Sequence, residues 1–303
     1  MTDLTAPPPL PVRTGPMPFS MILDEAMRRV RRHFRTMYPA VAIPLTLLAA
    51  ATGVLQALWF QRLFGEIGEG GPPTFSFETI LMGLLQGLIL VIGMMALQKA
   101  AMDAVAGRPI DMKRAWRFAI QPAVLGTLIL QFFAILGSAL FCFFPVLFVA
   151  PLLSLVGPIM ADENIYGTRA LSRSAELTRY NPQGRFSETA LVKALLLMIV
   201  TVVISYFVAI VVTLPFQIPM YIDIFRQAAS GEEPAMAAMS KWLWLQVPAQ
   251  ILQMLATVAV YSYSSFGYAL LFADTRSRKE GSDLATEINS VFGPGRPAGE
   301  PAP

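Results

Sequence analysis

Long apolar stretches separated by short polar segments dominate this sequence. A bilayer core about 30 Å thick requires about 20 residues of helix, and six stretches approach or exceed that length. They lie near Tyr38–Phe60, Ile80–Ala101, Gln121–Phe143, Phe144–Met160, Val192–Phe216 and Trp242–Phe272. The third and fourth meet directly, and Pro145 can end one helix and start the next, so we expect a tight hairpin there. The pattern predicts an all-α integral membrane protein with six transmembrane helices.

The segment before the first stretch has a different, amphipathic pattern. Its apolar residues recur at helical spacing and arginines fill most of the positions between them. We therefore expect a cytoplasmic amphipathic helix that lies on the membrane surface. The apolar side consists of Phe19, Ile22, Leu23, Met27, Val30, Phe34 and Met37.

Composition divides the chain into three parts. Residues 1–18 and 285–303 are rich in proline and polar residues and poor in apolar periodicity, which predicts flexible tails. Between them, residues 19–284 form the predicted membrane domain, with the amphipathic helix and the six spans.

The few charged residues are distributed asymmetrically. They make up 14% of the chain, against about 25% in a typical soluble domain. All of the 23 basic residues except Arg62, Arg226 and Lys241 lie in or next to alternate segments, beginning with the segment before the first span. Because positively charged segments stay cytoplasmic, this alternation predicts that both termini are cytoplasmic. The net charge of +3 therefore reports topology, and we expect no nucleic-acid partner.

Basic residues on this predicted inner side form a candidate surface for lipid headgroups or a protein partner. Anionic headgroups of the cytoplasmic leaflet attract such residues. An electrostatic elbow without a ligand is the alternative interpretation of the segment Tyr166–Phe186. The candidate residues are Arg28, Arg29, Arg32, Arg35, Arg173, Arg179, Arg185, Arg276, Arg278 and Lys279.

The last apolar stretch contains a continuous polar stripe, because polar side chains recur there every three or four residues. Polar groups that face lipid would lack hydrogen-bond partners, so the stripe is expected to face the bundle interior, a groove or a partner. Interhelical hydrogen bonding and a polar groove for headgroups or a small solute both fit. The stripe consists of Gln246, Gln250, Gln253, Thr257, Tyr261, Ser264 and Tyr268.

Residue types that carry enzymatic chemistry are scarce. The single histidine, His33, has neither a second histidine nor a nearby cysteine with which to hold a metal. The single cysteine, Cys142, lies in an apolar stretch and is predicted to pack as a small apolar residue. We therefore predict no catalytic residue, no metal site and no cofactor. Gly83 and Gly87 form a Gly-x-x-x-Gly pattern that favours close helix packing, within the bundle or in a homodimer.

Three segments resemble a bacterial family of integral membrane proteins related to the membrane portion of glycerophosphoryl diester phosphodiesterases. FSMILDEAMRRVRRHF (Phe19–Phe34) is similar to the family's amphipathic helix, ALSRSAELT (Ala170–Thr178) to its elbow, and ADTRSRKEGSDL (Ala273–Leu284) to its closing motif. The chain has Ala175 and Ser282 where that family usually has tryptophan and an aromatic residue. The resemblance implies a six-span protein of the bacterial inner membrane, here without a phosphodiesterase domain.

Two functions follow from these patterns as hypotheses. The first is a non-enzymatic scaffold or accessory protein that engages anionic lipid and a partner protein through its basic cytoplasmic face. The alternative is a transporter or facilitator for a small solute or lipid that uses the polar stripe. Pro151 and Pro158 in the fourth span, and Pro215 and Pro219 at the end of the fifth, would interrupt these helices as in many transporters. The middles of the spans carry no charged residue, which disfavours ion coupling.

Overall fold

The computed structural model describes residues 17–68, 77–141, 143–180, 189–230 and 242–281. Within these ranges every regular element is a helix, which confirms the predicted all-α class. The helices are α1 (Phe19–Gly68), α2 (Phe77–Val105), α3 (Met112–Ala119), α4 (Pro122–Phe141), α5 (Phe143–Leu152), α6 (Val156–Glu163), α7 (Thr168–Thr178), α8 (Ala190–Ser230) and α10 (Leu243–Glu280).

Six helical stretches in the described part of the chain are long and apolar enough to cross a membrane. By length and composition the chain is therefore a multi-pass membrane protein. Two of these stretches, in α4 and α8, are largely exposed on the protein surface. Large apolar side chains such as Phe132 and Phe207 point outward there, as expected of surfaces that face lipid.

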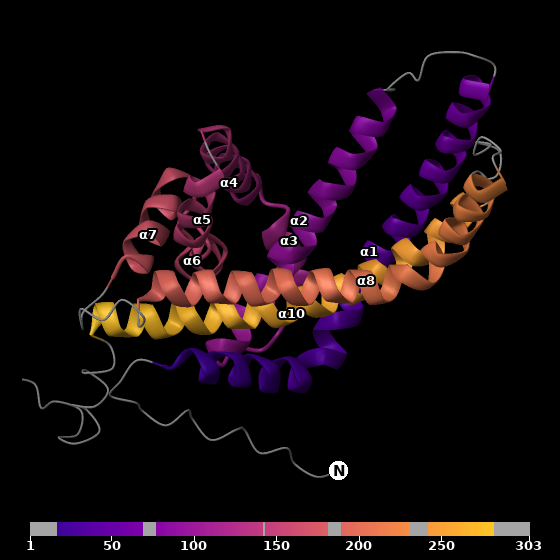
Figure 1. Ribbon diagram of the computed structural model, residues 1–303. Coiled ribbons are helices and arrows are strands. Elements are labelled where there is room, and N and C mark those ends of the chain that lie inside the picture. The colour runs from indigo at the N-terminus through magenta and orange to yellow at the C-terminus, as the bar shows by residue number, and fades with distance from the viewer. Residues whose placement is uncertain (1–16, 69–76, 142, 181–188, 231–241, 282–303) are drawn as a thin grey trace, which may run out of the picture.

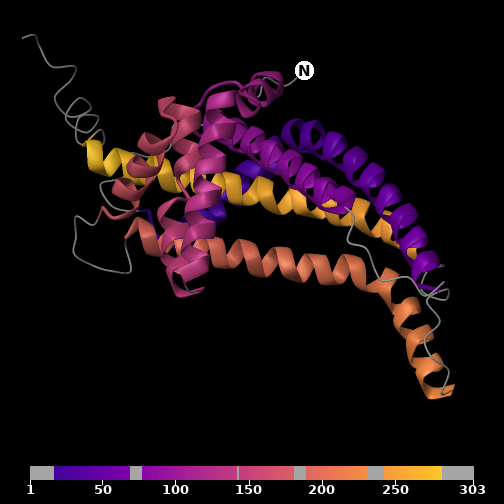
Figure 2. The same ribbon diagram turned by 90° about the horizontal axis from the view of Figure 1, so that it is seen from above.

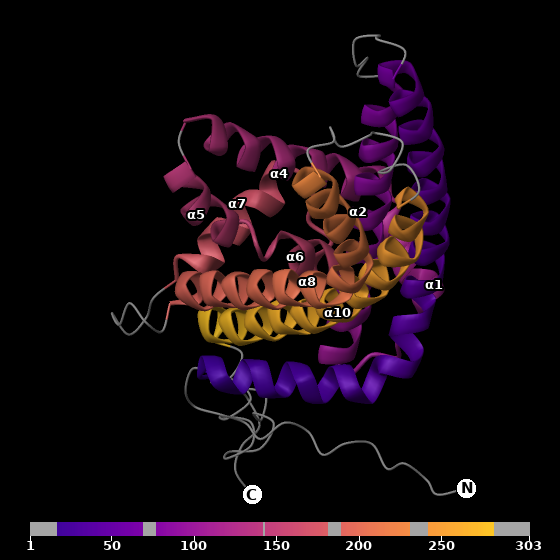
Figure 3. The same cartoon turned by 45° about the vertical axis from the view of Figure 1, so that its right-hand side comes forward.

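Helix α1 joins two segments that the sequence divides into a surface helix and a first span. It continues through Pro39 and Pro44 as one helix of 50 residues. Figure 3 shows a sharp bend between its first part, which lies beside α10, and the remainder, which runs beside α2. Proline removes a backbone hydrogen bond and commonly kinks a helix, so these two residues account for the bend.

The short helix α3 supports this bend. Its first turn is capped by Asp111, whose carboxylate accepts hydrogen bonds from the backbone N–H of Lys113 and of Arg114. The Trp116 indole N–H donates to the Ala40 carbonyl at 3.2 Å. In an unbroken helix that carbonyl would accept from residue 44, but Pro44 has no N–H. Trp116 therefore satisfies the carbonyl that the proline leaves without its helical partner.

Prolines act differently in the two helices where interruption was expected. The fourth apolar stretch is divided near Pro151, where α5 ends at Leu152 and α6 begins at Val156, but Pro158 lies within α6 and does not interrupt it. The expectation was wrong for the fifth stretch, since α8 continues through Pro215 and Pro219. Figure 2 shows that α8 bends toward its far end. The prolines therefore redirect α8 without ending it.

Helix α10 is the centre of the packing. It contacts α1 on one side and α8 on the other, and it also touches α2 (Figure 1). Phe266 and Phe272 are fully buried within it. A Cβ at Gly267 would lie 2.8 Å from the Leu197 side chain, so the glycine permits the close approach of α8. Gly83 and Gly87, the predicted packing pattern, have no neighbour within 4 Å of a Cβ in the described protein.

Candidate functional site

Charged side chains from four helices and one loop meet in a continuous network, termed here the charged cluster. The helices are α2, α6, α7 and α10, and the loop follows α2. Since the sequence places these segments far apart, the fold alone brings them together. The cluster consists of Lys99, Asp103, Arg108, Asp162, Glu163, Arg173, Glu176, Arg276, Lys279 and Glu280.

The base of the charged cluster is buried. The Lys99 ammonium lies 3.1 Å from the Asp103 carboxylate and donates to the Ala161 carbonyl at 2.8 Å. Both side chains are less than one-tenth exposed. Asp103 is also paired with Arg108 at 3.0 Å, and this arginine reaches Asp162 at 2.7 Å. A buried charge needs such partners, because leaving it alone would cost several kcal/mol.

The middle of the charged cluster joins α6 to α10. The Arg276 guanidinium contacts Asp162 at 2.5 Å, Glu163 at 3.6 Å and Glu280 at 2.9 Å. From α7, Arg173 contacts Glu163 at 3.3 Å and is also paired with Glu280. Two arginines thus share the carboxylates at the end of α6 and hold α7 and α10 against it.

Two groups on α7 have shifted pKa values that reflect this pairing. Burial alone would lower the pKa of Arg173, but hydrogen bonds to Glu163 and Glu280 raise it overall. The hydrogen bond from Lys279 lowers the pKa of Glu176 below the ordinary carboxyl value, against an opposing effect of burial. Both groups are therefore charged near neutral pH.

Asp274 anchors a second contact, at the start of α1. Its carboxylate accepts from the Met17 backbone N–H at 3.0 Å and from Arg278 at 2.7 Å. Lys193 donates to the Met17 carbonyl at 2.7 Å and lies 3.9 Å from Asp274. The chain thus approaches α1 through a fixed position between α8 and α10.

The elbow (Ala170–Thr178) and the closing motif (Ala273–Leu284) both contain residues with structural roles. In the elbow, Ser174 is buried and its hydroxyl donates to the Leu152 carbonyl at 2.6 Å, with Thr178 at 3.5 Å from the same oxygen. This satisfies a carbonyl at the end of α5. In the closing motif, Glu280 pairs with Arg276, and Gly281 ends α10 with φ of 67°, a conformation that glycine adopts readily.

The loop between α6 and α7 forms a corner with unusual backbone conformations. Asn164 ends α6 with φ of 54°, and Gly167 begins α7 with φ of 66° and ψ of −146°. The last combination is open almost only to glycine. The Gly167 N–H donates to the Thr127 hydroxyl at 2.7 Å, which fastens the loop to α4.

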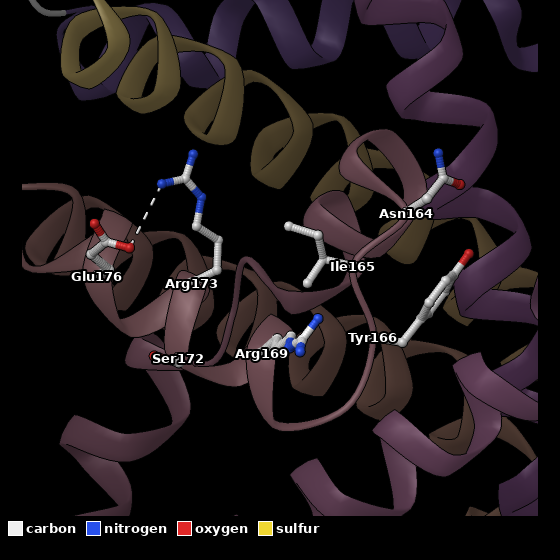
Figure 4. A pocket seen from close by; sticks show the side chains of 7 residues that line it. All are labelled: Asn164, Ile165, Tyr166, Arg169, Ser172, Arg173 and Glu176. Atoms are coloured by element: carbon white, nitrogen blue, oxygen red, sulfur yellow. Dashed lines mark ion pairs between the residues drawn. The ribbon is translucent and has the colours of Figure 1, made fainter.

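A cavity of about 620 Å³ opens at this loop and is termed the corner cavity. Figure 4 shows its lining side chains, which come from the loop and from the exposed side of α7. Arg173 and Glu176 form an ion pair at its edge. The lining residues are Asn164, Ile165, Tyr166, Arg169, Ser172, Arg173 and Glu176.

The first part of α1 presents arginines away from the protein. Its apolar side, represented by Ile22, Val30 and Met37, is buried in the core beside α10. Arg29 is half-buried and bonds to Glu25 and to the Ala104 carbonyl. The opposite side is exposed and is termed the α1 arginine face: it contains Arg28, Arg31, Arg32 and Arg35.

The structure separates the predicted basic residues into two groups. Arg32, Arg35 and Arg179 are exposed, as is Arg28, which pairs with Glu25 at 3.2 Å. By contrast, Arg173, Arg276, Arg278 and Lys279 are occupied by carboxylates. Arg185 lies outside the described residues.

Sequence reasoning missed the roles of Asp162, Glu163 and Glu280 in the charged cluster and the buried pair at its base. The candidate surface was chosen from basic residues alone, because they determine membrane topology. A usable signal existed, since Lys99 and Asp103 stand four residues apart on one helix face, and Asp162–Glu163 directly follows an apolar stretch.

The polar stripe on α10 lies away from the corner cavity. Gln250 donates to the Gln56 side-chain oxygen on α1 at 2.7 Å, and the Ser264 hydroxyl donates to the Tyr261 carbonyl at 3.1 Å. The amide oxygen of Gln250 is buried without a hydrogen-bond partner among the described residues. Gln253 is exposed, Ser264 is buried, and the others are half-buried: Gln246, Gln250, Thr257, Tyr261 and Tyr268.

The remaining candidates for chemistry are separate from the charged cluster. His33 stacks on Phe266, with ring centroids 6.2 Å apart. Within the part of the chain that the structure describes, no group of three or more histidine, cysteine, aspartate or glutamate side chains is arranged to hold a metal ion. Cys142 lies outside that part.

The fold and the site define the class of this protein: an all-helical, multi-pass membrane protein with a network of ion pairs where four of its helices meet. In comparisons with known proteins, no protein-family model, curated protein or solved structure matches this chain.

Proposed function

We propose that this chain is a non-enzymatic membrane scaffold or accessory protein, and that its basic face engages anionic lipid and a partner protein. The α1 arginine face carries this proposal. The opposite, apolar side of this part of α1 is buried against α10, so protein contacts hold the helix in place. Its exposed guanidinium groups are therefore available to an anionic surface.

The overall arrangement supports the same proposal. The end of α1 and the start of α2 lie together at one extremity of the molecule, far from the charged end of α10 (Figure 1). If the charged end faces the cytoplasm, the arginines meet the anionic leaflet there. Together with the family resemblance, this supports a location in the bacterial inner membrane with both termini cytoplasmic.

Lipid selectivity tests this function. Purified protein in mild detergent is titrated with phosphatidylglycerol or phosphatidylcholine and bound lipid is counted by native mass spectrometry. A variant with Arg31, Arg32 and Arg35 changed to glutamine should lose selectivity for the anionic lipid, by about fivefold for each arginine that contacts it, since one such contact contributes about 1 kcal/mol.

The matched control changes exposed arginines at the opposite extremity, Arg62→Gln and Arg226→Gln. It should retain wild-type selectivity. Equal loss in both variants, or no preference of the wild type for phosphatidylglycerol, would overturn the proposal. The same spectra show whether the protein is a monomer, a homodimer or bound to another protein.

Transport of a small solute or lipid through the polar stripe is the second candidate function. The observation that favours it is the buried Gln250 amide oxygen, which has no partner among the described residues and would accept a hydrogen bond from a solute. The variant Gln246→Leu/Gln250→Leu/Gln253→Leu should then lose a small molecule that the wild type retains. An unchanged spectrum from folded protein would exclude this site.

A further inference from the structure

The corner cavity has the size and the polar lining of a small-molecule site. Ligand pockets in proteins commonly measure about 300 to 1,000 Å³, and this one measures about 620 Å³. The loop that forms it is fastened to α4 through Thr127, and α7 is fastened to the break between α5 and α6 through Ser174. The cavity is thus built on fixed elements.

One lining arginine is free to bind a ligand. Arg169 is exposed and forms no ion pair with any residue that the structure describes. Arg173, one helical turn later, is committed to Glu163 and Glu280. In Figure 4 the only ion pair among the lining residues joins Arg173 to Glu176. Arg169 therefore supplies the uncompensated positive charge of the cavity.

The negative charge in the lining is already offset. The Glu176 carboxylate is held by Lys279 and by Arg173 at 3.6 Å. The Ser172 hydroxyl and the Asn164 amide can donate hydrogen bonds, whereas the Tyr166 hydroxyl already donates to the Gln121 side-chain oxygen at 3.5 Å. Ile165 adds an apolar surface. An anion with an organic substituent fits this combination better than a simple inorganic ion.

We propose that the corner cavity binds a phosphate ester, with the Arg169 guanidinium contacting the phosphate oxygens. Guanidinium and phosphate form paired, charge-assisted hydrogen bonds, and the Ser172 hydroxyl and Asn164 amide complete the set of donors. The ester belongs either to a lipid headgroup or to a soluble metabolite. This inference rests on the proposed function, since it assigns a particular site to the anionic lipid.

Three single substitutions test the site in the full-length purified protein. Arg169→Gln should weaken binding of the phosphate ester about tenfold, as expected when a charged hydrogen bond is lost. Glu176→Gln should tighten binding, because it removes the one carboxylate from the cavity lining. Arg62→Gln, an exposed change at the opposite extremity of the molecule and outside the lining, should leave binding unchanged.

The ligands are phosphatidylglycerol, phosphatidylcholine and glycerol 3-phosphate, each titrated by native mass spectrometry with thermal unfolding as a check on folding. If the variants change binding of phosphatidylglycerol alone, the ester is a lipid headgroup; if they change binding of glycerol 3-phosphate also, the soluble ester is a ligand. Identical binding by wild type, Arg169→Gln and Glu176→Gln overturns the cavity site but leaves lipid engagement by the α1 arginine face standing. If wild type does not prefer phosphatidylglycerol, the proposed function fails independently.

Discussion

Lys99 and Asp103 show how single residues organise the charged end of this protein. Each is buried, and each has a second partner: the Ala161 carbonyl for Lys99 and Arg108 for Asp103. These partners are unequal, because a carbonyl dipole neutralises an ammonium far less than a guanidinium neutralises a carboxylate. The two residues therefore depend on their ion pair to different degrees.

Removing the Asp103 carboxylate should lower the free energy of unfolding more than removing the Lys99 amine. Asp103→Leu leaves the Lys99 charge buried beside a carbonyl and is expected to lower the free energy of unfolding by about 3 to 5 kcal/mol. Lys99→Met leaves Asp103 paired with Arg108 and should cost less. Denaturant unfolding in detergent measures both.

The double variant Lys99→Met/Asp103→Leu controls for packing changes. It should be more stable than Asp103→Leu alone, since no buried charge is left without its partner. If Lys99→Met proves the more damaging single change, the ion pair does not stabilise the base of the charged cluster as described.

At the scale of helices, kinks and breaks are matched by side chains from neighbouring elements. Trp116 satisfies the Ala40 carbonyl at the bend of α1, and Ser174 satisfies the Leu152 carbonyl at the end of α5. Backbone groups in a membrane protein need such partners because lipid offers none. The buried Ser174 and Thr178 of the elbow are therefore explained by their hydrogen bonds, whereas the exposed Ser172 and Glu176 line the corner cavity.

Replacing Trp116 with phenylalanine tests this compensation. Phenylalanine keeps much of the ring packing but cannot donate a hydrogen bond, so the Ala40 carbonyl loses its side-chain donor. The expected loss is about 1 to 3 kcal/mol in the free energy of unfolding. Trp244→Phe is the control, because Trp244 is exposed. Equal stability of Trp116→Phe and the wild type would show that the bend does not need this bond.

For the whole molecule, apolar periodicity predicts the helices well and their bends and partners poorly. Each of the six apolar stretches is helical, the fourth as two helices, since stretch length and apolar composition are local properties. The bend of α1 and the continuity of α8 depend on how neighbouring elements accommodate proline. The local sequence pattern carries no information about those neighbours. The two prolines of α8 therefore looked like an interruption.

Sequence reasoning was least complete at the candidate site, and for the same physical reason. It identified Arg173 and Arg276 as basic surface residues, whereas the structure pairs both with Glu163. The partners are far apart in sequence, so only the fold reveals which arginines are neutralised. Arg169, absent from the predicted surface, becomes the candidate ligand residue because its neighbours are already paired.

Both proposals depend on which side of the membrane the charged end of the protein faces. It can be measured by cysteine labelling after Cys142→Ser removes the native thiol. Single cysteines replace Ser172, beside the corner cavity, and Arg62, at the opposite extremity of the molecule; both positions are exposed. A membrane-impermeant maleimide is applied to right-side-out spheroplasts and to inverted membrane vesicles.

The expected result is labelling of Arg62→Cys only in spheroplasts and of Ser172→Cys only in inverted vesicles, because basic segments remain cytoplasmic. Labelling of Ser172→Cys from outside the spheroplasts would contradict the proposed orientation, and with it the engagement of the anionic inner leaflet by the basic face.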